Sequence, residues 1–256
     1  MNLWVPHIPK NAGTTITKSL VNFCSPPVFE ITDLYVDDAY SNNKCVLIKN
    51  TVTNNKIKLG HNNPLKPDMI DWLKILVIRD PIKRFISYFN YRKYEKFFDY
   101  NKTIFNLSMD DYLKEERYHG EWGTDTIAFL NDIPDTSLTF NKNDIFEKFD
   151  YIIDVTNIDK IFKLIDDNLI GKTVKKIKKK FLWEDHNKSY VNINMLNNVV
   201  SLYSNKIFNK LNKEKYELFQ EENLTKDQLE KIHNIPWVKE DLEFYKLWKV
   251  KNQQFK

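Results

Sequence analysis

The first sixteen residues place a strand, a short loop and the start of a helix in immediate succession. An apolar run over residues 3–8 is followed by Pro9 and Lys10, then by small residues, and a helix can begin at Thr14. In this arrangement the unpaired N–H groups and the positive end of the helix dipole point into the loop. Lys10 adds a positive charge, and Thr14 and Thr15 add hydroxyl donors. The stretch predicts a site for a phosphate-like dianion, although an ordinary strand-to-helix turn carrying a lysine fits the same pattern.

The loop does not have the Walker A spacing of ATP-binding proteins. That motif, Gly-x4-Gly-Lys-Ser/Thr, places the lysine directly after its glycines. Here Lys10 precedes the single Gly13 by three residues. A small-molecule or nucleotide kinase would share an anion-binding loop, but the sequence shows neither the Walker A lysine nor a clear aspartate for Mg²⁺. These two observations disfavour a kinase.

A second strand-to-helix junction lies in the middle of the first half of the chain. The apolar, β-branched run over residues 74–78 has strand length and ends in Arg79, Asp80 and Pro81. Pro81 suits the first position of a helix, with Asp80 as its cap. Arg79 is therefore expected at the carboxyl end of a strand, where open α/β sheets bind their ligands.

Together the two junctions resemble motifs of the sulfotransferases that use 3′-phosphoadenosine 5′-phosphosulfate (PAPS), in particular the carbohydrate 2-O type. In that family a Pro-Lys-x-x-Gly-Thr-Thr/Ser loop holds the 5′-phosphosulfate, and an Arg-Asp-Pro-x-x-Arg-x-x-Ser-x-Tyr/Phe segment holds the 3′-phosphate. The first motif is matched here by Pro9, Lys10, Gly13, Thr14 and Thr15. The second motif is matched by Arg79, Asp80, Pro81, Arg84, Ser87 and Phe89. Near the end of the chain, residues 241–245 resemble the Asp-x-x-x-Tyr ending of the same family.

The resemblance implies the fold. It predicts one sulfotransferase domain over residues 1–256, with a three-layer α/β/α arrangement and a mostly parallel central sheet like that of the P-loop NTPases. The alternation of strand-like and helix-like segments independently favours such a sheet. The nucleotide-binding core is expected within residues 1–171 and a mainly helical completion within residues 172–256.

The resemblance also implies roles for individual residues. The co-substrate would be PAPS and the nucleotide product 3′-phosphoadenosine 5′-phosphate (PAP). Lys10 would stabilise the leaving group, while Arg79 and Ser87 would hold the 3′-phosphate that distinguishes PAPS from ATP-like nucleotides. The residues expected along the 5′-phosphosulfate are Pro9, Lys10, Asn11, Ala12, Gly13, Thr14 and Thr15. Neither the resemblance nor a cluster of ligand-type residues implies a metal ion.

His61 is the leading candidate for the catalytic base. Gly60 and His61 end a strand-like run, and a Gly-His at this place supplies the base in the 2-O-type carbohydrate sulfotransferases. An imidazole, with an ordinary pKa of about 6.5, can accept the proton of a hydroxyl group at neutral pH. A loop histidine is also often structural, so Glu121, Glu184 and His186 remain as alternatives, since other sulfotransferases use a glutamate.

Composition narrows the class of protein. With 42% hydrophobic and 29% charged residues the chain is globular, and its net charge of +4 suits an anionic ligand without requiring nucleic acid. Cys24 and Cys45 support neither a disulfide framework nor a metal site. No run reaches the ~20 apolar residues of a membrane span, and no charged-then-apolar leader precedes Leu3. We therefore expect a cytoplasmic protein, unless a native anchor precedes this chain.

Several partners remain open. The expected acceptor carries a hydroxyl group, and the resemblance favours a carbohydrate over a small molecule or a protein tyrosine. A non-catalytic nucleotide- or nucleic-acid-binding protein is the alternative from a different class, and it could use the lysine-rich run 175–180 with nearby aromatic rings. Such a protein would have no reason for the arrangement of Arg79 and Ser87, and a solvated helix face explains the lysines more simply. The sequence does not indicate the acceptor or the oligomeric state.

Overall fold

The computed structural model of the chain describes residues 1–11, 16, 29–35, 45–60, 63–95, 107–115, 123–165, 167 and 219–254. The chain forms two compact units, each assembled from two stretches of sequence. The first unit combines residues 1–78 with 130–205, and the second combines residues 79–129 with 206–256. The predicted boundary at residue 171 lies outside the described residues and stays a prediction.

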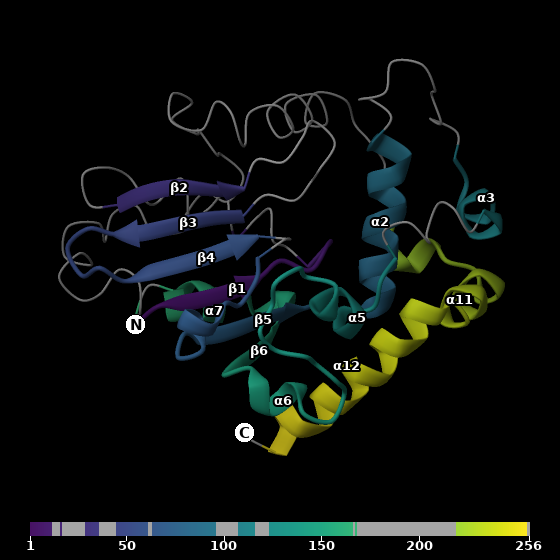
Figure 1. Ribbon diagram of the computed structural model, residues 1–256. Coiled ribbons are helices and arrows are strands. Elements are labelled where there is room, and N and C mark those ends of the chain that lie inside the picture. The colour runs from purple at the N-terminus through teal and green to yellow at the C-terminus, as the bar shows by residue number, and fades with distance from the viewer. Residues whose placement is uncertain are drawn as a thin grey trace. The chain divides into compact units, whose positions relative to one another are not determined.

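A sheet of six described strands forms the centre of the first unit (Figure 1). The strands are β1 (Leu3–Pro6), β2 (Phe29–Tyr35), β3 (Cys45–Asn50), β4 (Lys56–Gly60), β5 (Leu73–Ile78) and β6 (Tyr151–Asp154). Their order across the sheet is β2-β3-β4-β1-β5-β6. β3 pairs antiparallel with β2 and with β4, whereas β4, β1, β5 and β6 pair parallel with one another. Among the described strands only β3 therefore runs against the others, and the expected α/β fold with a mostly parallel sheet is confirmed.

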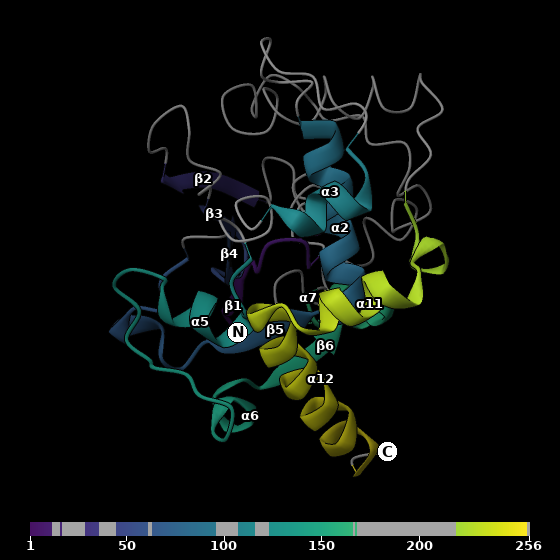
Figure 2. The same cartoon turned by 90° about the vertical axis from the view of Figure 1, so that its right-hand side faces the viewer.

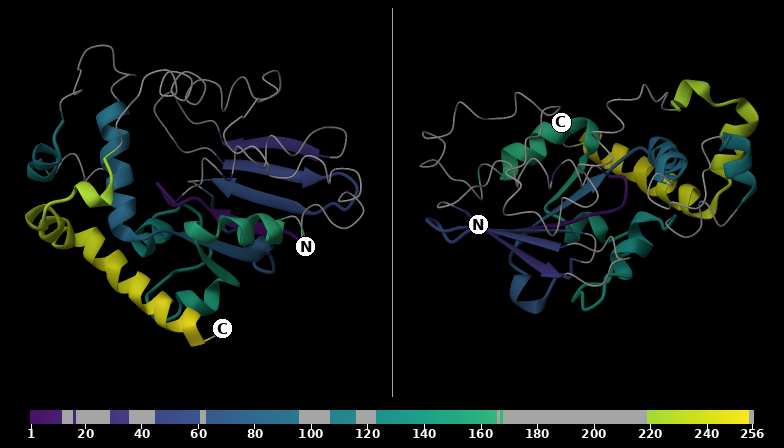
Figure 3. Two further views of the ribbon diagram at one scale, coloured as in Figure 1. Left: turned by 180° about the vertical axis from the view of Figure 1, so that it is seen from behind. Right: turned by 90° about the horizontal axis from the view of Figure 1, so that it is seen from above.

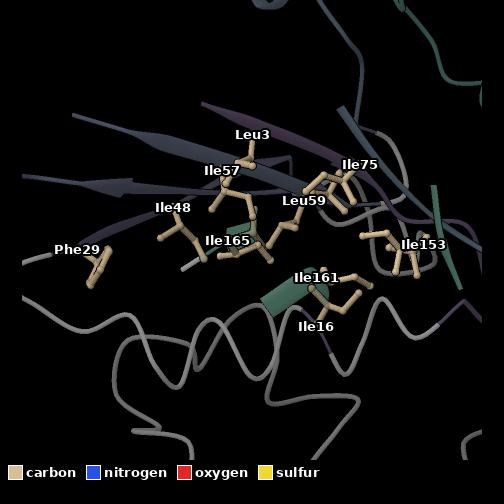
Figure 4. Close-up of a cluster of buried hydrophobic side chains, with 13 residues drawn as sticks. Leu3, Ile16, Phe29, Ile48, Ile57, Leu59, Ile75, Ile153, Ile161 and Ile165 are labelled. Atoms are coloured by element: carbon tan, nitrogen blue, oxygen red, sulfur yellow. The ribbon is translucent and has the colours of Figure 1, made fainter. Parts of the chain in front are cut away.

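One face of the sheet is covered by a helix near the end of the described part of this unit. The described helical segments that lie wholly in the first unit are η1 (Pro67–Met69), α6 (Ile145–Lys148), η2 (Val155–Asn157) and α7 (Ile158–Ile165). Seen from behind, α7 lies along the sheet (Figure 3). Ile161 and Ile165 of α7 are fully buried in a cluster that contains Leu3, Ile57 and Ile75 from the strands (Figure 4). Burial of these side chains stabilises the unit by roughly 1.5–3 kcal/mol each.

The opposite face of the sheet is covered by an aromatic cluster. Leu3 and Trp4 are neighbours on β1, so their side chains point to opposite faces. Trp4 is fully buried, and its ring stacks on Phe149 at 5.6 Å and on Phe140 at 6.4 Å between ring centroids. Both phenylalanines flank α6, so this segment covers the face that α7 leaves open. With both faces covered, β1 and β5 are buried on each side, which explains their nearly continuous apolar sequences.

The second unit is helical in its described part (Figure 2). Its helical segments are α2 (Pro81–Glu95), α3 (Met109–Lys114), the start of α5 (Thr126–Asn131), η4 (Glu221–Asn223), α11 (Lys226–His233) and α12 (Pro236–Gln254). α2 packs against α12, and α11 packs against α2 and α3. Phe85 of α2 lies at the centre of this core, between the rings of Tyr112 and Trp237. None of the described helices combines the length and apolar character that crossing a bilayer requires.

Candidate active site

The lysine of the first motif lies in a strained turn directly after β1. The N–H of Asn11 donates to the carbonyl of Ile8 at 3.1 Å, which closes a four-residue turn with Pro9 and Lys10 in its centre. Lys10 has φ = 65°, so its backbone is left-handed. Proline followed by a residue with positive φ is the pattern of a type II turn, in which the second position normally holds glycine or asparagine. A lysine there costs about 1–2 kcal/mol in backbone energy, and such strain is typical of functional sites.

Asn11 anchors this turn to the sheet. Its side chain is 2% exposed, and its Nδ2 donates to the carbonyl of Val77 in β5 at 3.0 Å. Its Oδ1 is buried and has no hydrogen-bond partner among the described residues. A phosphate offers no proton to such an acceptor, so the contacts that the structure shows for Asn11 hold the loop in place. Val77 lies two residues before Arg79, so the anchor joins the first motif to the strand that leads into the second.

The end of β4 lies beside the end of β1. Pro6 and Gly60 are register partners in the parallel β1–β4 pair, and the N–H of His7 donates to the carbonyl of Gly60 at 2.7 Å. Gly60 has φ = 149° and is buried. A side chain at this φ is disfavoured, so the position requires glycine. His61 follows in the sequence but lies outside the described residues.

An asparagine that belongs to neither motif closes the loop after β4. Asn63 is fully buried, and its Nδ2 donates to the carbonyls of Val5 at 3.2 Å and Lys58 at 3.0 Å. The indole N–H of Trp4 in turn donates to the Asn63 carbonyl at 2.9 Å. These bonds tie β1, β4 and the loop together two residues beyond His61. The Asn-Pro dipeptide at this position signals a turn, but nothing in the sequence shows which carbonyls the amide reaches.

A small pocket lies at the carboxyl ends of β1, β4 and β5 in the first unit. The residues that line it are Val5, Pro6, His7, Asn11, Ile16, Leu59 and Val77. This is the edge of the sheet at which open α/β folds bind ligands. Lys10 directly precedes Asn11, which lines the pocket, and is half-buried.

The Arg-Asp-Pro segment begins α2 as its sequence predicts. Asp80 caps the helix, because its Oδ1 accepts the N–H of Ile82 at 3.0 Å and the N–H of Lys83 at 3.3 Å. Pro81 is buried at the first helical position, where a missing N–H costs nothing. Arg79 is half-buried and precedes the cap. The aspartate and the proline of the motif thus begin the helix, which leaves the arginine as its ligand-type side chain.

The second arginine of the motif has a different environment from the first. Arg84 is fully buried and forms an ion pair with Asp241 of α12, 157 residues away in the sequence. Its other amino group donates to the carbonyl of Thr124 at 2.9 Å, and Asp241 accepts the N–H of Thr126 at 2.7 Å. Burial alone would lower the pKa of Arg84, but the attraction of Asp241 and the interaction with Tyr88 outweigh it and raise the pKa. Arg84 is a permanent buried cation, and the late Asp-x-x-x-Tyr segment supplies its counter-ion.

Ser87 lies one turn after Arg84 on α2 and is half-buried, so part of its surface can reach a ligand. In the first unit, Pro9, Lys10 and Asn11 lie in the turn after β1, beside the end of β4. In the second unit, Arg79 lies just before α2 and Ser87 lies within it. The other predicted site residues lie outside the described part of the chain: Ala12, Gly13, Thr14, Thr15, His61, Glu121, Glu184 and His186. The lysine run 175–180 lies outside it as well. Within the described residues no three acidic, histidine or cysteine side chains gather as metal ligands.

Comparison with protein families identifies the chain. The model of the sulfotransferase family matches residues 2–220, most of the chain, so this protein belongs to the sulfotransferase family. The match spans both strand-to-helix motifs and supports transfer of a sulfuryl group to a hydroxyl-bearing acceptor. No curated protein and no solved structure showed significant similarity to the chain.

Proposed function

We propose that this protein transfers the sulfuryl group of PAPS to a hydroxyl group of a carbohydrate. Membership in the sulfotransferase family supports the reaction class. The observation that carries the proposal is the turn at Lys10, a lysine in left-handed backbone at the carboxyl end of the central strand. The left-handed conformation of a lysine costs backbone energy, and strain of this kind clusters at functional sites. A lysine ammonium beside loop N–H groups suits the phosphosulfate of PAPS.

In this reaction the acceptor oxygen attacks sulfur in line with the departing nucleotide oxygen. The new S–O bond forms as the bond between sulfur and the bridging oxygen of PAPS breaks, and PAP leaves with the electron pair. Lys10 would stabilise the charge that develops on the bridging oxygen. His61 would take the proton of the acceptor hydroxyl. As in phosphoryl transfer, most of the rate then comes from positioning and charge stabilisation.

Arg79 and Ser87 would supply recognition of the 3′-phosphate. A guanidinium binds a phosphate with two parallel hydrogen bonds, and a serine hydroxyl adds one more donor. The support is their exposure: both residues are half-buried, while the neighbouring Arg84 is fully buried. The loop residues 9–15 would then hold the 5′-phosphosulfate through Lys10, hydroxyl groups and backbone N–H groups.

The carbohydrate acceptor rests on the resemblance of the Gly-His segment and the two motifs to the 2-O type. A small-molecule hydroxyl and a protein tyrosine are acceptors of the same chemistry, and an acceptor screen separates them. The cytoplasmic location stays a sequence prediction, to be checked by cell fractionation of the native protein.

Thermal unfolding with nucleotides tests the proposal. A ligand present at 100 times its Kd stabilises the native state by about 2.7 kcal/mol, which corresponds to a rise in Tm of roughly 5–10 °C for a chain of this size. PAP should produce this rise, whereas ADP and adenosine 5′-phosphosulfate, which lack the 3′-phosphate, should produce much less. Equal stabilisation by ADP and PAP would contradict the role given to Arg79 and Ser87.

A further inference from the structure

Two charged side chains connect three segments inside the second unit. Arg84 of α2 and Asp241 of α12 are 0% and 4% exposed, and each uses more than one polar atom. Arg84 donates to Asp241 and to the carbonyl of Thr124, and Asp241 accepts from Arg84 and from the N–H of Thr126. α2, α12 and the beginning of α5 are therefore held in one hydrogen-bonded arrangement.

Stability alone gives a weak reason for this arrangement. Taking two charges out of water is costly, and apolar side chains of similar volume often stabilise a core equally well or better. The surroundings are suited to such a core, because the Trp237 and Tyr88 rings lie 5.1 Å and 5.7 Å from the guanidinium carbon of Arg84. Apolar contacts have no preferred direction, whereas a guanidinium–carboxylate pair fixes the relative orientation of both partners.

In the sequence, Arg84 lies between the two residues proposed to hold the 3′-phosphate. Arg79 precedes the cap of α2, and Ser87 follows Arg84 by three residues on the same face of the helix. The main-chain N–H of Arg84 donates to the carbonyl of the cap residue Asp80 at 2.8 Å. A change in the rotation of α2 about its axis would therefore move Arg79 and Ser87 together.

We propose that Arg84 and Asp241 are positioning residues that set the rotation of α2, and through it the selectivity of Arg79 and Ser87 for a nucleotide with a 3′-phosphate. The inference rests on the proposed function and deepens it. Neither residue touches the nucleotide: Arg84 has no exposed surface, and both Asp241 oxygens are already hydrogen-bonded within the unit.

The test compares Kd values for PAP and ADP, measured by titration calorimetry well below the Tm of each variant. D241N keeps the shape of the side chain and the acceptor for Thr126 but removes the negative charge. R84Q/D241N replaces both charges by amides. A matched control is I232V, which trims a fully buried side chain of the same core and leaves both charged residues unchanged. Both nucleotides bind only the folded protein, so a loss of stability alone does not change the ratio of the two Kd values.

We expect D241N and R84Q/D241N to lower the preference for PAP over ADP by about tenfold or more, which is 1.4 kcal/mol. I232V should lower the Tm and keep the wild-type preference. If D241N does not fold, R84K carries the test, because it retains the charge but loses the planar fork that reaches Thr124. An unchanged preference in the folded variants would overturn the inference. A wild-type protein without any preference for PAP would instead overturn the proposed function itself.

Discussion

The left-handed turn at Lys10 predicts that two substitutions with the same effect on turnover differ in stability. Lys10→Ala and Lys10→Gly both remove the ammonium group, so their loss of charge is the same. They differ only in the Cβ atom at φ = 65°. The left-handed conformation costs an alanine about 1–2 kcal/mol. Glycine avoids this cost but destabilises the protein by up to about 1 kcal/mol through the greater entropy of its unfolded state. Lys10→Gly should therefore be the more stable of the two, by roughly 0.5–1 kcal/mol.

Thermal unfolding and sulfuryl-transfer assays on both variants check these two expectations. Thermal unfolding should give Lys10→Gly a Tm about 1–4 °C above that of Lys10→Ala. Sulfuryl transfer from PAPS should be slower in both variants by a factor on the order of 10², the scale of losing one preorganised charge. Equal Tm values would refute the strained turn. Full turnover with weaker PAPS binding would show that Lys10 only binds the co-substrate.

Three further substitutions test other parts of the site. His61→Ala should lower turnover by roughly 10² to 10⁴, keep PAP binding and remove the acidic limb of the pH–rate profile. The control His233→Ala, on the exposed surface of α11, should keep both the turnover and the pH–rate profile of the wild type. An intact acidic limb in the His61 variant would assign the base to one of the alternative residues. Gly60→Ala should lower the free energy of unfolding by about 1–3 kcal/mol in denaturant titrations, because φ = 149° is essentially restricted to glycine; wild-type stability would contradict that. Replacing three lysines of 175–180 by Gln should leave the Kd for PAP nearly unchanged and raise the KM of an anionic acceptor, whereas a large loss of PAP affinity would place this run in the nucleotide site.

The sequence predicted the features that depend on local chemistry. The strand over 74–78, the cap at Asp80 and the proline at the first helical position are all present, because strand length, capping and proline geometry act over a few residues. The alternation of strands and helices gave the α/β class, and the family match agrees with the two motifs.

Other features depend on contacts that local patterns do not encode. The counter-ion of Arg84 is 157 residues away, and periodicity carries no information about which carboxylate a buried guanidinium meets. The amide of Asn63 reaches carbonyls on two strands, which only the register of the sheet decides. The positive φ of Lys10 runs against the preference of turns for glycine or asparagine. In each case tertiary structure determines the local conformation or the choice of partner.

Transfer of labelled sulfate tests the central claim most directly. Purified protein is incubated with PAPS labelled in the sulfuryl group and with a panel of carbohydrates, tyrosine peptides and small alcohols, and both products are separated. We predict labelled carbohydrate and an equal amount of PAP from the wild-type protein, and a rate lower by about two orders of magnitude from Lys10→Ala. Labelled product that forms at the same rate with Lys10→Ala, or no labelled product with any hydroxyl-bearing acceptor while PAP binds, would contradict the account.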